Sequence, residues 1–205
     1  MADEIVASGG RAVAVAGDVA DPATHDALVG TATDRFGRLD IAFNNAGMVG
    51  RAAPLPQLAL AEWQAVLGTN LTGAFLGARA QIPAMAAGGG GAIVFTGSFV
   101  GCSVGLPGMA AYAAAKAGLL GLVRGITADH AADGIRANAL LPGGTDTGMA
   151  GDAAQRAWAA GLHAMKRIAQ PEEIARAALF LVSDMASFVT GSALWADGGN
   201  AAVKL

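Results

Sequence analysis

Short apolar runs alternate along the chain with longer stretches whose apolar positions recur at helical spacing. The runs are bounded by glycine, proline or acidic residues, which predicts buried strands. The predicted strands cover residues 11–16, 39–43, 92–96, 135–141 and 192–196. The predicted helices cover residues 24–36, 60–85, 112–133 and 171–183, with the end of another helix at 1–9 and a helical segment at 151–165.

This alternation predicts an α/β fold with a parallel sheet covered by helices on both faces. The expected architecture is a doubly wound, Rossmann-like sheet in three layers, α/β/α. Because no linker or repeat interrupts residues 1–205, we expect a single domain. Hydrophobic residues make up 54% of the chain, aromatic residues only 5%, and 30 residues are glycine, which indicates close packing of helices on the sheet.

Charge and cysteine content exclude several classes of function. A net charge of −3 with no basic run argues against a nucleic-acid-binding surface. The single cysteine, Cys102, excludes an internal disulfide framework and fits a reducing, cytoplasmic compartment. Residues 92–123 contain one charge, Lys116, but glycines and Pro107 interrupt them, so we predict a buried strand and helix and no membrane span. The acidic start of the chain is unlike a signal peptide.

Tyr112, the only tyrosine, stands four residues before Lys116, one of three lysines. The alanines between them favour helix, so the two side chains lie one turn apart on the same face. A neighbouring ammonium stabilises an ionised phenol, which suits a general acid and base acting on a substrate oxygen. A buried tyrosine beside a solvated lysine is the structural alternative.

Polar or glycine-rich groups follow the predicted strands, at the sheet edge where ligands of such folds bind. Each group alone could be turn chemistry, but together with Tyr112 they predict one site. The groups are Asp18-Val19, Asn44-Asn45-Ala46-Gly47, Gly97-Ser98 and Pro142-Gly143-Gly144-Thr145-Asp146-Thr147.

The ordered set of motifs resembles the short-chain dehydrogenase/reductase family over essentially the whole chain. Members of that family move hydride between NAD(P) and a carbonyl or alcohol. The matching motifs are Asn44-Asn45-Ala46-Gly47, Asn70 in Thr69-Asn70-Leu71, Ser98-x-x-Gly101, Tyr112-x-x-x-Lys116, Asn138 before Pro142-Gly143-x-x-x-Thr147, and Asp197-Gly198-Gly199.

The resemblance implies four catalytic residues. Tyr112 is the acid and base, and Ser98 hydrogen-bonds the substrate oxygen. Lys116 lowers the pKa of Tyr112, and Asn70 holds a water that continues the proton relay. Ser98 as a plain strand end and Asn70 as a helix hydrogen-bonding residue are the structural alternatives.

The same resemblance implies an NAD or NADP site. Tyr112 and Lys116 hold the nicotinamide ribose, the 142–147 segment meets the nicotinamide end, and glycine at 47 lets the backbone approach the cofactor. Asp18 could equally form a turn. The implied cofactor-binding residues are Asp18, Val19, Asn45, Ala46, Gly47, Tyr112, Lys116, Pro142, Gly143, Thr145 and Thr147.

One departure from the family concerns its opening βαβ portion. Family members begin with a strand, a Gly-x-x-x-Gly-x-Gly turn and a helix, and this sequence contains no such turn, so the fold is expected without that portion. The strand at 39–43 then has an unpaired edge. We expect residues 11–16 to shift and pair directly with 39–43, which would move Asp18 away from the adenine, or another chain to cover the edge.

Three functional interpretations follow. The first is a working NAD(P)-dependent oxidoreductase, and the second is a weak or dead remnant that persists as an oligomeric binding module. A lyase or hydrolase using Tyr112 and Ser98 without a dinucleotide is the third. For substrate, residues 148–165 offer few charges, and a 3-oxoacyl thioester, a simple ketone or secondary alcohol and a small polyol all fit. The residue that selects NAD or NADP is not among those present.

Partners and metals complete the expectations. The helix from Tyr112 is apolar on more than one face, and in the family it forms a subunit interface with the preceding long helix, so we expect a homodimer or homotetramer. No metal site is predicted, because His25, His130 and His163 share no ligand spacing. We expect all three histidines to be solvated.

Overall fold

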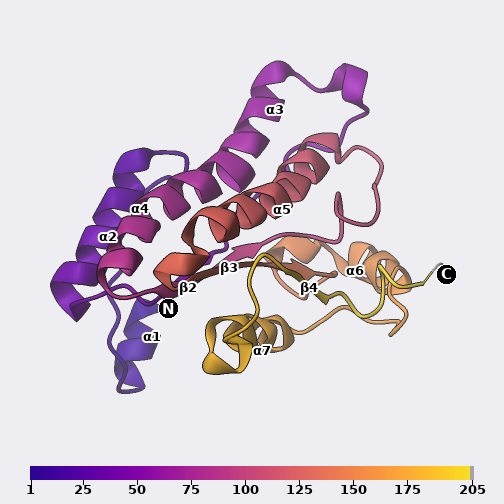
Figure 1. The fold of residues 1–205 in the computed structure, drawn as a ribbon. Helices are drawn as coiled ribbons and strands as arrows, with labels where there is room; N and C mark the ends of the chain where they lie inside the picture. Colours follow the sequence, from indigo (N-terminus) through magenta and orange to yellow (C-terminus); the bar gives the residue numbers. More distant parts are fainter. Residues whose placement is uncertain (204–205) are drawn as a thin grey trace.

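The computed structural model describes residues 1–203, and a four-stranded parallel sheet lies at its centre (Figure 1). The strands follow chain order across the sheet: β1 (Ile41–Asn44), β2 (Gly91–Thr96), β3 (Ile135–Pro142) and β4 (Ala193–Ala196). In the register, Phe43 lies opposite Val94, which lies opposite Asn138. The parallel sheet predicted from the sequence is confirmed.

One face of the sheet is covered by α4 (Gly73–Ala87) and α5 (Ala110–His130). Outside them, α2 (Pro22–Phe36) packs on α4, and α3 (Leu60–Leu67) packs on α5 (Figure 1). The main core lies between this layer and the sheet. Its fully buried members include Ile93, Phe95, Leu119, Ile135 and Leu141.

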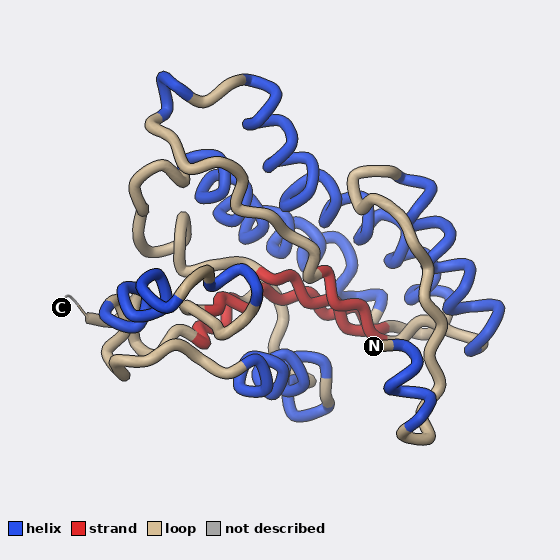
Figure 2. Tube along the Cα trace, turned by 180° about the vertical axis from the view of Figure 1, so that it is seen from behind, coloured by secondary structure: helices blue, strands red, loops and turns tan. Residues whose placement is uncertain are grey.

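The opposite face is covered by α7 (Pro171–Val182), which contacts β2, β3 and β4. Leu181 packs there against Val94 and Leu140 in a second, smaller core. Figure 2, seen from behind, shows the strands between helices of both layers. The expected α/β/α layering is confirmed, although α7 leaves β1 uncovered.

The remaining elements are short. They are α1 (Ala2–Ala7), α6 (Ala153–Gly161), the 3-10 turns Leu55–Gln57, Ala131–Asp133, Gly148–Ala150 and Asp184–Ala186, and a π-helical turn, η2 (Gly68–Thr72). The predicted helix at 60–85 is therefore interrupted by η2 between α3 and α4. Among residues 1–203, no helix is long and apolar enough to cross a membrane.

Capping residues explain where two of the helices begin. Asp21 accepts a hydrogen bond from the Ala23 N–H, with Pro22 at the first helical position of α2. Before α7, the Glu173 carboxylate accepts the N–H of Gln170, and Pro171 again takes the first position. These caps fix the first residues of α2 and α7.

The strand predicted at 11–16 is wrong. These residues form no strand, and Val13 is exposed. Arg11 is held by its side chain, which donates to the Arg35 carbonyl and lies 5.0 Å from the Phe36 ring centroid. A strand forms only when its backbone hydrogen-bonds to a neighbouring strand, and no described strand lies beside this segment.

The expected shift of 11–16 onto β1 is also wrong. β1 pairs with β2 on one side only, and the side chains of Ile41 and Phe43 are 50% and 46% exposed. Among the described residues, this edge of the sheet has no partner strand.

Candidate functional site

Tyr112 and Lys116 lie on the first turns of α5, where that helix faces the end of β2. Lys116 is only 2% exposed, and its Nζ donates a 2.6 Å hydrogen bond to the carbonyl of Thr96, the last residue of β2. The same Nζ lies 5.6 Å from the Tyr112 ring centroid. The predicted pair is thus formed, with the ammonium anchored to the sheet edge.

Burial controls the ionisation of both groups. Desolvation lowers the pKa of Lys116 to about 8. Desolvation also raises the pKa of Tyr112, and a hydrogen bond with the Ser98 side chain opposes that rise. The phenol is therefore harder to ionise here than the Tyr112–Lys116 pair alone would predict.

Ser98 is buried and is the second residue after β2. Its Oγ accepts the Val100 N–H at 3.1 Å, which fixes the start of the following loop. Gly101 in that loop has φ +88°, and a Cβ there would lie 2.2 Å from the Ala113 carbonyl oxygen. Glycine thus lets the Ser98 loop approach the Tyr112 helix closely.

Cys102 lies in the same loop, where its Sγ is 3.8 Å from the Lys116 carbonyl oxygen. Burial raises the pKa of this thiol. Cys102 is therefore not activated as a nucleophile.

Asn70 lies inside η2 and is almost fully buried. Its Nδ2 donates to the carbonyls of Val66 and Met48, both at 2.8 Å, and its Oδ1 accepts the Met48 N–H. A Cβ on Gly47 would lie 2.8 Å from Asn70 Oδ1 and 3.3 Å from Lys116 Nζ. Gly47 thus brings the backbone between Asn70 and Lys116, and the π-helical turn aims Asn70 at this point.

Asn45 and Val19 lie beside this cluster. Asn45 Oδ1 accepts the Thr96 hydroxyl at 2.8 Å. Val19, Asn45 and Ala46 line a cavity of about 150 Å³ that begins at the end of β1. Asp18 is exposed and accepts the Ala20 N–H in a local turn, so the structure does not bring it to this cavity.

The segment from Pro142 to Thr147 follows β3 and is held by neighbouring backbone. The Phe99 N–H donates to the Pro142 carbonyl, and the Gly143 N–H donates to Ala196. Thr145 pairs with Ala169 in an isolated parallel bridge. Thr147 at the far end is exposed.

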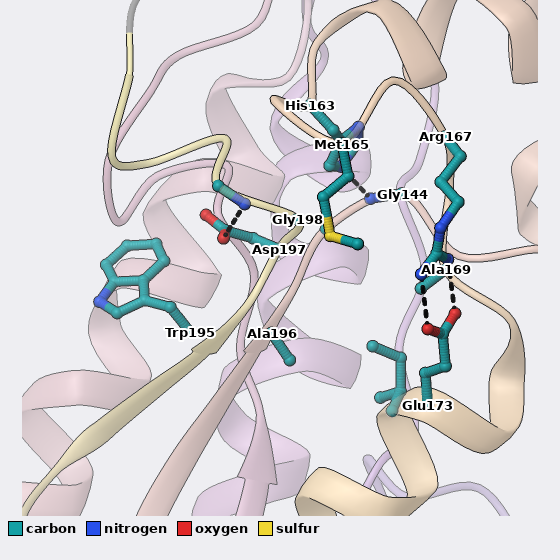
Figure 3. A pocket seen from close by; sticks show the side chains of 13 residues that line it. Gly144, His163, Met165, Arg167, Ala169, Glu173, Trp195, Ala196, Asp197 and Gly198 are labelled. Carbon is teal, nitrogen blue, oxygen red and sulfur yellow. Dashed lines mark hydrogen bonds and ion pairs between the residues drawn. The ribbon is translucent and has the colours of Figure 1, made fainter.

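A cavity of about 270 Å³ lies beyond β3 and β4, on the outer side of this segment (Figure 3). Gly143, Gly144, His163 and Asp197 form one part of its lining. On the other side, Arg167 makes a bidentate ion pair with Glu173, each bond 2.7 Å.

The histidines differ from the sequence expectation. His25 is buried, with its Nε2 2.8 Å from the Val19 carbonyl oxygen, and His163 is only 2% exposed. The expectation that they are solvated is wrong for these two, whereas His130 is partly exposed beside Asp133. No sequence spacing singled out His163, because its partner Gly144 is 19 residues away. Among residues 1–203, no three His, Cys, Asp or Glu side chains gather as metal ligands.

The arrangement fits the ribose and nicotinamide end of a dinucleotide. A buried ammonium and a buried amide converge where Gly47 presents bare backbone, and the ammonium lies 5.6 Å from the Tyr112 ring centroid. Such donors bind ribose hydroxyls, and the Gly143 segment offers peptide groups at the adjacent strand end. The structure brings together Ser98, Tyr112, Lys116, Asn70, Asn45 and Gly47. The Phe99 N–H joins the loop after Ser98 to the carbonyl of Pro142, and Gly143 follows Pro142 in the chain.

Comparison with known proteins identifies relatives along nearly the whole chain. A family model described as "Enoyl-(Acyl carrier protein) reductase" matches residues 1–201. Cyclohexanol dehydrogenase of Acinetobacter sp. (strain SE19) is 40% identical over 198 residues, which are 97% of this chain and 78% of that protein. Cis-4-hydroxycyclohexanecarboxylate dehydrogenase of Sinomonas cyclohexanicum is 42% identical over 200 residues, 96% of this chain and 79% of that protein.

The fold agrees with these relatives. The crystal structure of carveol dehydrogenase from Mycobacterium avium in complex with NAD superposes with a TM-score of 0.92 at 31% identity, covering 97% of this chain and 78% of that one. Identity at this level over nearly the whole chain, together with the matching family model, shows that the chain belongs to the short-chain dehydrogenase/reductase family of NAD(P)-dependent oxidoreductases.

Proposed function

We propose that this chain interconverts a secondary alcohol and a ketone on an alicyclic ring, with a nicotinamide dinucleotide as the hydride carrier. The observation that carries this proposal is the placement of the Tyr112 ring centroid 5.6 Å from the buried ammonium of Lys116, with the buried Ser98 next to it. These groups stand at the carboxyl edge of the parallel sheet, where ligands of doubly wound folds bind.

Tyr112 and Ser98 act on the same substrate oxygen. In the oxidation, Tyr112 accepts the hydroxyl proton while Ser98 donates a hydrogen bond to the oxygen as negative charge develops there. A nicotinamide dinucleotide, when bound, would supply the acceptor for the hydride. In the reduction, Tyr112 returns the proton to the carbonyl oxygen.

Lys116 and Asn70 support the proton transfer. The Lys116 ammonium stabilises the ionised phenol, and its low pKa of about 8 leaves it able to release a proton near neutral pH. Asn70 and Lys116 both border Gly47, and this arrangement suits a water that links the two side chains.

The cofactor-binding roles follow the same placement. Lys116, Tyr112, Asn45, Ala46 and Gly47 hold the nicotinamide ribose. The peptide groups and side chains of Pro142, Gly143, Thr145 and Thr147 would meet the nicotinamide end, and Val19 would lie toward the adenine, whereas Asp18 is held in a local turn outside that cavity.

An apolar, ring-shaped substrate is supported by the segment after the cofactor loop. Met149 and Trp158 are more than half exposed there, and both precede the turn at Leu162. Two relatives are named for cyclohexane rings that bear a hydroxyl group. We therefore assign a cyclohexanol-like secondary alcohol as the substrate class.

A homodimer or homotetramer in the cytoplasm completes the proposal. On the outer face of α4, Phe75 is 47% exposed, and on α5 a Cβ at Gly121 or Gly125 would meet open space. These surfaces suit close helix packing by a second copy. Light scattering on the purified protein measures the assembly, and a monomer at micromolar concentration would contradict it.

The function is tested by following NADH or NADPH formation from cyclohexanol. We expect turnover by the wild-type protein, a loss of about a thousandfold in kcat for Tyr112→Phe, and a loss of at least a hundredfold for Ser98→Ala. Ser103→Ala is the matched control, because Ser103 is exposed in the same loop and donates only to the Phe99 carbonyl.

Two results would contradict the proposal. One is a Tyr112→Phe variant as active as the wild type, which would remove the proton-transfer role. The other is a wild-type protein that binds neither NADH nor NADPH at millimolar concentration, because the hydride step then has no carrier.

A further inference from the structure

His163 lies just beyond the end of α6 and both nitrogens of its ring have hydrogen-bond partners. Its Nδ1 is 2.7 Å from the carbonyl oxygen of Ala159, and its Nε2 is 2.9 Å from the backbone nitrogen of Gly144 (Figure 3). A peptide N–H can only donate, so Nε2 must accept and the ring proton must be on Nδ1. The contacts therefore select one neutral tautomer of a buried histidine.

The ring is packed against the ends of three strands. Phe99, three residues after β2, meets it edge-on, with ring centroids 6.0 Å apart. A Cβ on Gly143 would lie 2.4 Å from His163 Nε2, and one on Gly198 would lie 3.4 Å from the His163 Cβ. The absence of a side chain at Gly143 is what lets the imidazole reach the backbone after β3, whereas the distance at Gly198 is an ordinary contact.

His163 also completes the bonding of the loop after β3. On one side of this loop, the Ala169 N–H donates to the Gly144 carbonyl and the Asp146 N–H donates to the Ala169 carbonyl, both at 2.8 Å. The Gly144 N–H points to the other side, where His163 Nε2 is its acceptor. Without the imidazole, a partly buried donor in this loop would have no protein partner.

We propose that His163 is a positioning residue that fixes the Gly143–Thr147 loop and, through it, the nicotinamide end of the bound dinucleotide. This inference rests on the proposed function, because the loop acts on the nicotinamide only in a dinucleotide-binding enzyme. The imidazole does not touch the reacting atoms. It sets the position of peptide groups that do.

Two substitutions separate the two hydrogen bonds of the ring. In His163→Asn the side-chain amide reaches the Nδ1 position, so the bond to Ala159 is kept and the Gly144 N–H loses its acceptor. In His163→Gln the amide oxygen reaches the Nε2 position, so the Gly144 bond is kept. Both variants lose the same ring contact with Phe99, so they are matched for packing.

The first readout uses cofactor-free protein. We expect the Gly144 amide to exchange its hydrogen at least tenfold faster in His163→Asn than in His163→Gln or the wild type. In the wild type, ¹⁵N spectra of the imidazole should show a protonated Nδ1 and an unprotonated Nε2. This measurement needs no variant, and the opposite tautomer would overturn the inference.

The second readout uses NADH and NADPH, followed by nicotinamide fluorescence and steady-state kinetics. We expect His163→Asn to bind the preferred dinucleotide about tenfold more weakly and to lose kcat, with His163→Gln within threefold of the wild type. Equal losses in both variants would show a packing role only and contradict the inference. Unchanged binding in His163→Asn, beside an active wild type, contradicts the inference alone. A wild type that binds no dinucleotide contradicts the proposed function as well.

Discussion

The strands β2, β3 and β4 form one side of the sheet (the covered side), and β1 forms the other (the β1 side). The two sides differ in how their apolar side chains are covered. Val94 and Phe43 are register partners on β2 and β1, yet Val94 is buried beneath Leu181 of α7 and Phe43 is 46% exposed. The helix α7 contacts β2, β3 and β4, and the segment from Arg11 to Val19 forms no strand beside β1.

This contrast is reflected in individual side chains. Lys116, Ser98 and His163 lie beside β2 to β4, and each depends on burial: for a lowered pKa, for a fixed loop, or for a single tautomer. Beside β1, Asp18 is exposed and holds only a local turn. Burial therefore holds the first three groups in fixed positions, as acid–base and hydride chemistry require, and leaves Asp18 free of that constraint.

The largest expected difference between the two sides concerns their phenylalanines. Phe95 on β2 is fully buried in the main core, so Phe95→Ala should lower the free energy of unfolding by about 4 kcal/mol. Phe43→Ala on the neighbouring strand should cost about 1 kcal/mol, because half of that side chain already contacts solvent. Urea unfolding of the two variants measures both values.

Similar costs for the two variants would contradict the contrast. A large loss in Phe43→Ala would mean that the β1 edge is covered in solution, for which a second copy of the chain is the simplest occupant. Measuring the assembly state of that variant beside its stability distinguishes a lost interface from a lost core contact.

The sequence predicts the covered side well and the β1 side poorly, for a physical reason. Apolar runs such as 92–96 and 135–141 become strands because neighbours complete their ladders and helices bury both faces. The run at 11–16 has the same local pattern, but strand formation is decided by a partner, which no local pattern encodes.

In the functional site, too, local contacts can be predicted from the sequence and distant contacts cannot. Tyr112 and Lys116 are placed by helical spacing, a local property, so the sequence predicts their proximity. His163 is joined to Gly144 by a contact across 19 residues, and it packs against Phe99, Gly143 and Gly198, which follow three different strands. Its role could not be inferred from spacing, and the expectation of a solvated histidine followed from that gap.

An expected effect of intermediate size concerns two glycines, one in the Ser98 loop and one near the start of the chain. Gly101 and Gly9 have nearly equal φ angles of +88° and +86°, but a Cβ would lie 2.2 Å from the Ala113 carbonyl oxygen at Gly101 and meet nothing within 4 Å at Gly9. Gly9→Ala should cost about 1 kcal/mol from backbone strain alone. Gly101→Ala should cost about 3 kcal/mol and also reduce kcat, because the Ser98 loop must move away from the Tyr112 helix.

The matched angles make the result simple to interpret in urea unfolding and activity assays. Equal losses of stability would mean that the φ angle, and not the close approach of loop and helix, sets the cost. Full activity in Gly101→Ala would show that the position of Ser98 does not depend on this approach.

The smallest expected effect is a dependence of stability on pH that originates at Lys116. Its pKa is lowered to about 8 in the folded protein, whereas in the unfolded chain it returns to about 10.5. Between these values the unfolded chain binds more protons, so the stability of the fold rises with pH. Tyr112 has a raised pKa in the fold, so above about pH 10 the folded protein holds the phenol proton longer and stability falls again.

The contribution of Lys116 is therefore measured between about pH 7.5 and pH 9.5, where it should add about 2 kcal/mol to the free energy of unfolding. Lys116→Met removes the titrating group while keeping an apolar stem, so this rise should disappear. Lys166→Met is the control, because Lys166 is exposed and its loss should leave the rise intact. A Lys116→Met variant with the wild-type slope would show that the ammonium is solvated, and the buried proton relay beside Gly47 would then lose its basis.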